Sequence, residues 1–196
     1  MQEYIAPLRA LATLISGLNP RTATAVRVAE GLPYLSIKDI NQSLTKIDDL
    51  PRIQAALHEV QRFQVRSGDI VVTTRGTTVR AAVIESSHAG TVAGLNLAIV
   101  RVGPALAPYL LAAFLREPRT QAALLRDTAG AVTPGFTLKA LSELPIRVPS
   151  PERQKILVDY LVAASAYRDA MSRALELRQM ASDSLIAQEL SASKVV

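Results

Sequence analysis

The pattern of hydrophobic and polar positions changes near residue 150. Before that point, short apolar runs alternate with polar loops, which predicts a mixture of strands and short helices. Strands are expected where β-branched residues gather or where apolar and polar residues alternate, at 32–37, 65–74, 79–84, 92–102 and 144–148. After that point a single helical pattern runs to about residue 190 without Gly or Pro. The pattern predicts an α+β fold, with a β-rich globular part followed by one long helix.

Shorter helices are predicted inside the first part. Pro108 falls in the first turn of a helix over 106–116, and a second helix over 118–128 is closed by Gly130. A third short helix is expected over 51–61, with Pro at its start. Segments 22–30 and 38–50 are polar and are expected to be irregular or loops.

The long helix has a clear start and a regular apolar seam. Ser150 is a suitable N-cap, and Pro151 and Glu152 suit a first turn. Alternate steps of four and three residues pass through nine positions, seven of them apolar: Tyr160, Ala164, Tyr167, Met171, Ala174, Arg178, Ala181, Leu185 and Gln188. This spacing is that of a coiled coil.

Two interpretations of the long helix are open. It could be an ordinary amphipathic helix that lies on its own domain. Yet about 40 residues at 1.5 Å each span about 60 Å, whereas a globule of about 150 residues has a radius of gyration of about 15 Å. We therefore expect the helix to project and to pair with a partner through Tyr160, Ala164, Tyr167, Met171, Ala174, Ala181 and Leu185.

Composition narrows the class of protein. The chain has no Cys and only two His, so disulfides and thiolate sites are excluded, and we expect no metal and no cofactor. No stretch reaches 18 consecutive apolar residues, and the first residues lack the order of a signal peptide. The expectation is a soluble cytoplasmic protein without a membrane partner.

Charge is divided unevenly along the chain. Residues 1–151 carry 16 Lys or Arg and 11 Asp or Glu, whereas residues 152–196 carry six of each. Of the 16 cations in the first part, 13 are Arg, whose planar fork fits phosphates and guanine edges. This excess is compatible with nucleic-acid binding, but arginine is also an ordinary solubilising residue.

Catalytic motifs are absent from the sequence. There is no glycine-rich phosphate loop, no Gly-x-Ser-x-Gly elbow, no histidine-based triad and no Asn-Pro-Pro-Tyr methyltransferase loop. A carboxylate nuclease built on Asp69 and Glu85 is conceivable, but Asp69 follows Gly68 in a turn, where Asp commonly bonds the backbone. We predict a non-catalytic protein.

Polar loops supply the candidate DNA-binding groups. The break between two strands offers Thr73, Thr74, Arg75, Thr77, Thr78 and Arg80. Lys38, Asp39, Asn41 and Gln42 follow another strand end, and Asn19 and Arg21 form a third loop. Each loop has a plainer interpretation, as an internally bonded turn or a hydrophilic connection. The predicted DNA contacts are Asn19, Arg21, Lys38, Asn41, Arg75, Thr77, Thr78 and Arg80.

Six segments in order resemble one known family. They are Leu11–Gly17, Leu32–Ile40, Val65–Thr77, Asn96–Val102, Pro108–Leu115 and Leu144–Ile156, the last reading Leu-Pro-Ile-Arg-Val-Pro-Ser-Pro-Glu-Arg-Gln-Lys-Ile. Together they resemble the specificity (S) subunit of type I restriction–modification systems.

The resemblance implies a division of labour. Residues 1–149 would form a target recognition domain that reads double-stranded DNA. Residues 150–190 would form a helix for spacing, dimerisation and docking of methyltransferase (M) subunits, with residues 191–196 as a disordered tail. The partners would carry adenine methylation, and a restriction (R) subunit would carry cleavage.

One departure from the family pattern is large. A full specificity subunit resembles two such units in tandem, whereas this chain has one. It could be a natural half-subunit, a truncated gene product or an excised domain; as a half-subunit it is expected to form a homodimer through the helix. The alternative function is an orphan half-subunit that binds or inhibits a methyltransferase without reading DNA.

Overall fold

The computed structural model describes residues 3–19, 26–40, 44–128 and 131–191. The chain divides into two compact units, Met1–Gln154 and Lys155–Val196. None of the helices in the described ranges has the length and apolar character needed to cross a membrane.

The first unit holds all the strands and the short helices of the described residues. The strands are β1 (Tyr4–Pro7), β2 (Ala12–Ser16), β3 (Val26–Val28), β4 (Leu32–Leu35), β5 (Arg52–Gln54), β6 (Ile70–Thr73), β7 (Ala81–Val83), β8 (Val92–Ala93), β9 (Leu97–Val102) and β10 (Pro145–Val148). The α-helices are α1 (Leu57–Val60), α2 (Pro108–Arg116), α3 (Pro118–Leu125), α4 (Leu138–Ser142) and α5 (Pro151–Ser191), of which α5 continues into the second unit.

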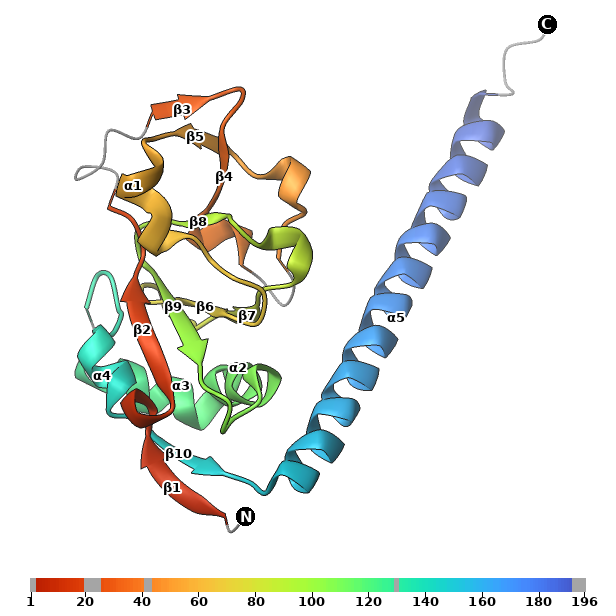
Figure 1. The fold of residues 1–196 in the computed structure, drawn as a ribbon. Coiled ribbons are helices and arrows are strands. Elements are labelled where there is room, and N and C mark those ends of the chain that lie inside the picture. Colours follow the sequence, from red (N-terminus) through yellow and green to blue (C-terminus); the bar gives the residue numbers. More distant parts are fainter. Residues whose placement is uncertain (1–2, 20–25, 41–43, 129–130, 192–196) are drawn as a thin grey trace, which may run out of the picture. The chain divides into compact units, whose positions relative to one another are not determined.

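A central antiparallel sheet organises this unit, in the strand order β2-β9-β6-β7. Its middle strands are buried on both faces, which explains their nearly continuous apolar sequence. In β6, Ile70 and Val72 belong to one hydrophobic core and Val71 to another. The first core also contains residues of α2, α3 and α4, and Figure 1 shows these helices on one side of the sheet.

A second sheet lies on the other side, in the order β3-β5-β4-β8, and β4 pairs with β8 in parallel. Strands β1 and β10 form a separate antiparallel pair, in which Pro7 faces Pro145. This pair joins the start of the chain to the segment just before α5 (Figure 1).

Most of the predicted elements are present. The strands expected at 32–37, 65–74, 79–84 and 144–148 correspond to β4, β6, β7 and β10, and the helices expected at 106–116 and 118–128 correspond to α2 and α3. The segment 131–137 precedes α4, a helix that the hydrophobic pattern did not indicate.

Three local predictions were wrong. The helix expected over 51–61 is strand β5 followed by the short α1, because 52–54 pair with both β3 and β4. The irregular segment 22–30 contains β3. The single strand expected over 92–102 is interrupted after β8, where Asn96 has a φ of 66° and the chain turns into β9.

Gly17 and Gly94 permit a close approach of two backbone segments. A Cβ atom on Gly17 would lie 2.0 Å from the carbonyl oxygen of Gly94, and one on Gly94 would lie 2.1 Å from the Tyr34 hydroxyl. Leu18 and Gly94 also form an isolated β-bridge. Gly17 is therefore required because any larger residue would collide with the backbone of Gly94.

The first turn of α5 is fixed to the first unit by Gln154. Its side chain is 8% exposed. Its Oε1 accepts a hydrogen bond from the backbone N–H of Ala107 at 2.8 Å, and its Nε2 donates to the carbonyl oxygens of Ala105 and Pro149 at 2.9 and 3.0 Å. These bonds join the base of the long helix to the N-terminus of α2.

Candidate nucleic-acid interface

The connection between β6 and β7 combines a fixed backbone with exposed side chains. The backbone N–H of Gly76 donates to the carbonyl oxygen of Pro134, and that of Phe136 donates to the carbonyl oxygen of Thr74. Gly76 has a φ of 116°, which favours glycine. The side chains of Arg75, Thr77 and Thr78 are exposed. The turn is thus internally bonded through its backbone, while its side chains remain accessible to a ligand.

Arg80 is more deeply integrated than its neighbours. Its guanidinium Nη1 donates to the carbonyl oxygen of Ile40 at 3.3 Å, and its backbone N–H donates to the Thr73 hydroxyl at 2.9 Å. This contact brings the start of β7 to the turn that carries Lys38. Two loops distant in sequence, both predicted to contact DNA, are therefore adjacent.

The Lys38 turn is a short 3-10 turn, Ile37–Asp39, with a capping box. Asp39 Oδ2 accepts hydrogen bonds from the backbone N–H and the hydroxyl of Ser36, at 2.9 and 2.5 Å. Asp39 is 5% exposed and therefore holds the turn, whereas Lys38 is exposed. The predicted contact Asn41, like Gln42, lies outside the described residues.

The third predicted loop begins next to Leu18. Asn19 is half-buried and directly follows Leu18, while Arg21 lies outside the described residues. Leu18 lines an open cleft of about 660 Å³. The structure therefore places Asn19 next to a residue that lines this cleft.

The cleft contains three arginines, Arg62, Arg66 and Arg101, that are not among the individually predicted DNA contacts. It is lined by Ile15 and Leu18, by residues of the segment 58–63, by Arg66 and by Arg101. The guanidinium of Arg62 lies 4.5 Å from the centre of the Phe63 ring, the geometry of a cation–π contact. The sequence signal was an alternation of polar residues with the buried Phe63 and Val65, in Gln61-Arg62-Phe-Gln-Val-Arg66, before a buried strand.

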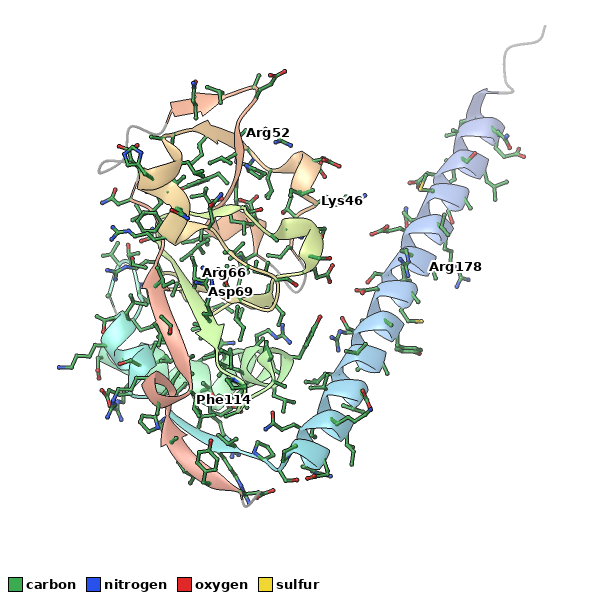
Figure 2. The ribbon with its side chains drawn as sticks, viewed as in Figure 1. Lys46, Arg52, Arg66, Asp69, Phe114 and Arg178 are labelled. Atoms are coloured by element: carbon green, nitrogen blue, oxygen red, sulfur yellow. The ribbon has the colours of Figure 1, made fainter. Side chains whose placement is uncertain are left out.

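Arg101 is held in the cleft by Asp69. Its Nε and Nη2 atoms donate to the two carboxylate oxygens at 2.9 and 2.7 Å, a bidentate pair, and Asp69 Oδ2 also accepts the backbone N–H of Arg66 at 2.8 Å. The hydrogen bonds to Asp69 raise the pKa of Arg101 above its usual value. Figure 2 shows Arg66 and Asp69 next to each other. Asp69 is thus engaged in a structural ion pair rather than available as a nuclease carboxylate.

The second unit, Lys155–Val196, contains most of helix α5, and many of the apolar side chains of this helix are exposed. Of the predicted seam, Tyr160, Tyr167, Met171 and Leu185 are 71, 68, 48 and 63% exposed. Ala174 and Ala181 are exposed and Ala164 is half-buried. Arg178, labelled in Figure 2, interrupts the seam.

Known proteins resemble this chain, with its α+β unit that carries exposed basic groups and its long helix, in sequence and in fold. No known family model matches the chain. The type I restriction enzyme EcoBI specificity subunit of Escherichia coli is 24% identical over 150 residues, which make up 74% of this chain and 31% of that subunit.

Solved structures share the fold. A structure described as concerning assembly and conformational transition of the type I R-M system matches 93% of this chain and 43% of its own, with a TM-score of 0.65 and 21% identity. The HsdS subunit of Thermoanaerobacter tengcongensis matches 88% of this chain and 39% of its own (TM-score 0.58, 22% identity). The type I S subunit of M. genitalium matches 99% and 47% (TM-score 0.59, 14% identity).

The chain shares the fold of these three solved structures. In sequence it is similar to the EcoBI specificity subunit over 74% of its own length. It spans less than half the length of each of these relatives.

Proposed function

We propose that this chain is the DNA-recognition component of a type I restriction–modification complex and that it is not itself catalytic. The observation that carries the proposal is that one relative in sequence and three in structure are all of the type I system. Adenine methylation would be carried out by methyltransferase subunits, and cleavage by a restriction subunit.

In this proposal the recognition domain, residues 1–149, contacts double-stranded DNA. The exposed side chains of Lys38, Arg75, Thr77 and Thr78 supply cationic and hydroxyl donors on two turns. Arginine and lysine donate to guanine edges and phosphates, while hydroxyls bond to either. The predicted contacts Asn19, Arg21, Asn41 and Arg80 remain part of the proposal. The net positive charge of the domain makes the binding salt-dependent.

The helix, residues 150–190, would space two recognition domains and dock the methyltransferase. Its exposed seam supports this role because exposed Tyr, Met and Leu side chains at coiled-coil spacing gain stability by pairing with another helix. In a homodimer, two copies of the domain would read an inverted repeat whose half-sites are separated by a gap.

A selection experiment tests the proposal. The chain, alone and together with a type I methyltransferase subunit, is incubated with duplexes of random sequence, and bound DNA is recovered and sequenced. We expect enrichment of one motif in two parts and methylation of an adenine in it by the assembled complex. If the chain binds the methyltransferase but enriches no motif, the orphan interaction function is correct instead. Methyl transfer by the isolated chain would contradict the non-catalytic assignment.

A further inference from the structure

The cleft lined by Arg62, Arg66 and Arg101 is distinct from the two turns that carry Lys38 and Arg75. Arg66 precedes β6, whereas Arg75, Thr77 and Thr78 follow it. The four residues of β6 span about 13 Å at about 3.3 Å each. Arg66, and Arg101 beside Asp69, therefore lie at the opposite end of this strand from the predicted base-reading turn.

The charge of the cleft favours an anion. Its lining includes three arginines and one carboxylate, that of Glu59. Arg101 is already paired with Asp69, so the excess positive charge comes from Arg62 and Arg66 against Glu59. Arg62 and Arg66 are exposed, so their guanidinium groups are accessible to a ligand. Each arginine carries a planar set of N–H donors that matches two oxygens of a phosphate.

The side chains are also restrained in a way that suits binding. Arg62 is stacked on Phe63, which limits its motion. Arg101 donates hydrogen bonds to Asp69 through its Nε and Nη2 atoms, which orients the guanidinium group. Neither of these bonds uses the Nη1 atom of Arg101. Restrained donors lose less conformational entropy when a ligand binds.

The form of the cleft favours a polymer over a small molecule. Small-molecule sites usually enclose most of their ligand, whereas this cleft is open. Arginines along an open surface suit a phosphodiester backbone, which continues past the site in both directions. Contacts of this kind fix the position of a protein on DNA without reading its sequence.

We propose that the cleft formed by Arg62, Arg66 and Arg101 binds the DNA backbone. Arg62 and Arg66 are the phosphate ligands, and Arg101 is held in place at the cleft by its ion pair with Asp69. This inference rests on the proposed function, because it presumes that the chain binds DNA. It adds a backbone contact at the end of β6 opposite the base-reading turn.

The test compares two double variants of the chain in complex with its methyltransferase. Arg62→Ala/Arg66→Ala removes the proposed ligands, and Arg126→Ala/Lys139→Ala removes two exposed cations elsewhere in the same unit. Affinity for the selected target and for a random duplex is measured by fluorescence anisotropy over a range of salt concentrations. Circular dichroism checks that each variant is folded.

The cleft variant is expected to lose affinity for both duplexes by the same factor. Its slope of log K against log salt should decrease in magnitude by about 1.8, since each lost phosphate contact accounts for about 0.9. The control should keep the wild-type slope. A cleft variant with the wild-type slope and affinity would overturn the inference while leaving the proposed function intact.

Two further outcomes would also overturn it. If the wild-type complex binds no DNA, the proposed function and the cleft assignment are both wrong. If AMP or inorganic phosphate binds the wild-type chain in calorimetry, requires Arg62 and Arg66, and does not compete with DNA, the cleft is a small-anion site instead. Competition between DNA and phosphate at these two arginines supports the backbone assignment.

Discussion

Gln154 is the residue that attaches the base of the long helix to the rest of the first unit. Its buried amide bonds the backbone N–H of Ala107 and the carbonyl oxygens of Ala105 and Pro149. Gln154→Leu keeps a similar volume but leaves these groups without partners, so the free energy of unfolding is expected to fall by about 1–3 kcal/mol. Urea unfolding followed by circular dichroism measures this change.

Arg153→Ala is the matched control for Gln154→Leu, because Arg153 lies in the same turn but is exposed. This substitution should change the free energy of unfolding by no more than about 0.5 kcal/mol. Equal stability of the wild-type chain and Gln154→Leu would show that the hydrogen bonds of Gln154 do not hold the helix base.

Arg75 and Arg80 are expected to respond differently to substitution. The side chain of Arg75 is exposed, so Arg75→Ala should leave stability unchanged and weaken binding to the target by about 1–3 kcal/mol if it contacts a base in bidentate fashion. Arg80 bonds the carbonyl oxygen of Ile40, so Arg80→Ala should also lower the thermal midpoint. Anisotropy and thermal unfolding separate the two effects. Wild-type affinity in both variants would remove this turn from the DNA-binding site.

At the scale of the element, strands and helices were predicted correctly where a strand is buried along its whole length or where the residues that start a helix are present. The β-branched run at 70–73 predicts β6, and Pro108 predicts the start of α2. The strand at 52–54 was missed because Ile53 is its only buried residue and its partners, β3 and β4, are non-local. Local propensity carries no information about such pairing.

The candidate site was predictable only in part for the same reason. Exposed turns such as that of Arg75 are marked by a polar break between strands, which the sequence shows directly. The cleft brings together Arg62, Arg66 and Arg101. Arg101 lies in β9, in a mostly apolar sequence that predicts only a buried strand. Its position beside Asp69 depends on the pairing of β6 with β9.

Helix α3 provides a prediction about pH. Glu117 is its N-cap, and its carboxylate accepts a hydrogen bond from the backbone N–H of Thr120 at 2.8 Å. Hydrogen bonds from the backbone of Arg119 and then of Thr120 lower the pKa of Glu117 below its ordinary value of 4.5. The stabilisation is therefore present above pH 4.5 and is lost as the pH falls through the lower pKa of the folded state.

Glu117→Ala should lower the thermal midpoint at pH 7, and the difference from the wild-type chain should disappear in acid, below the lowered pKa. Thermal unfolding by circular dichroism at several pH values measures it. Glu85→Ala is the control, because Glu85 is also at an N-cap position but makes no capping hydrogen bond with its side chain. A difference for Glu117→Ala that is the same at every pH would mean that the charge of the cap contributes nothing.

At the scale of the whole molecule, the exposed seam of α5 is the feature that the fold of the first unit does not explain. A helix of 41 residues spans about 60 Å. Its exposed Tyr160, Tyr167, Met171 and Leu185 would be covered if two copies of the helix paired. The length of the paired region would then set the distance between two recognition domains and hence between two half-sites on DNA.

Ala174→Glu tests this pairing, because it places a charge on the seam where a second helix would approach closely. Ala187→Glu makes the same substitution on the opposite face of α5, about 180° from Tyr160 around the axis at 100° per residue. In sedimentation velocity at micromolar concentration, the wild-type chain and Ala187→Glu are expected to be dimers, whereas Ala174→Glu should shift toward a monomer. A wild-type chain that sediments only as a monomer would rule out the homodimer. The seam would then be assigned to the methyltransferase, and Ala174→Glu should weaken that complex while Ala187→Glu leaves it intact.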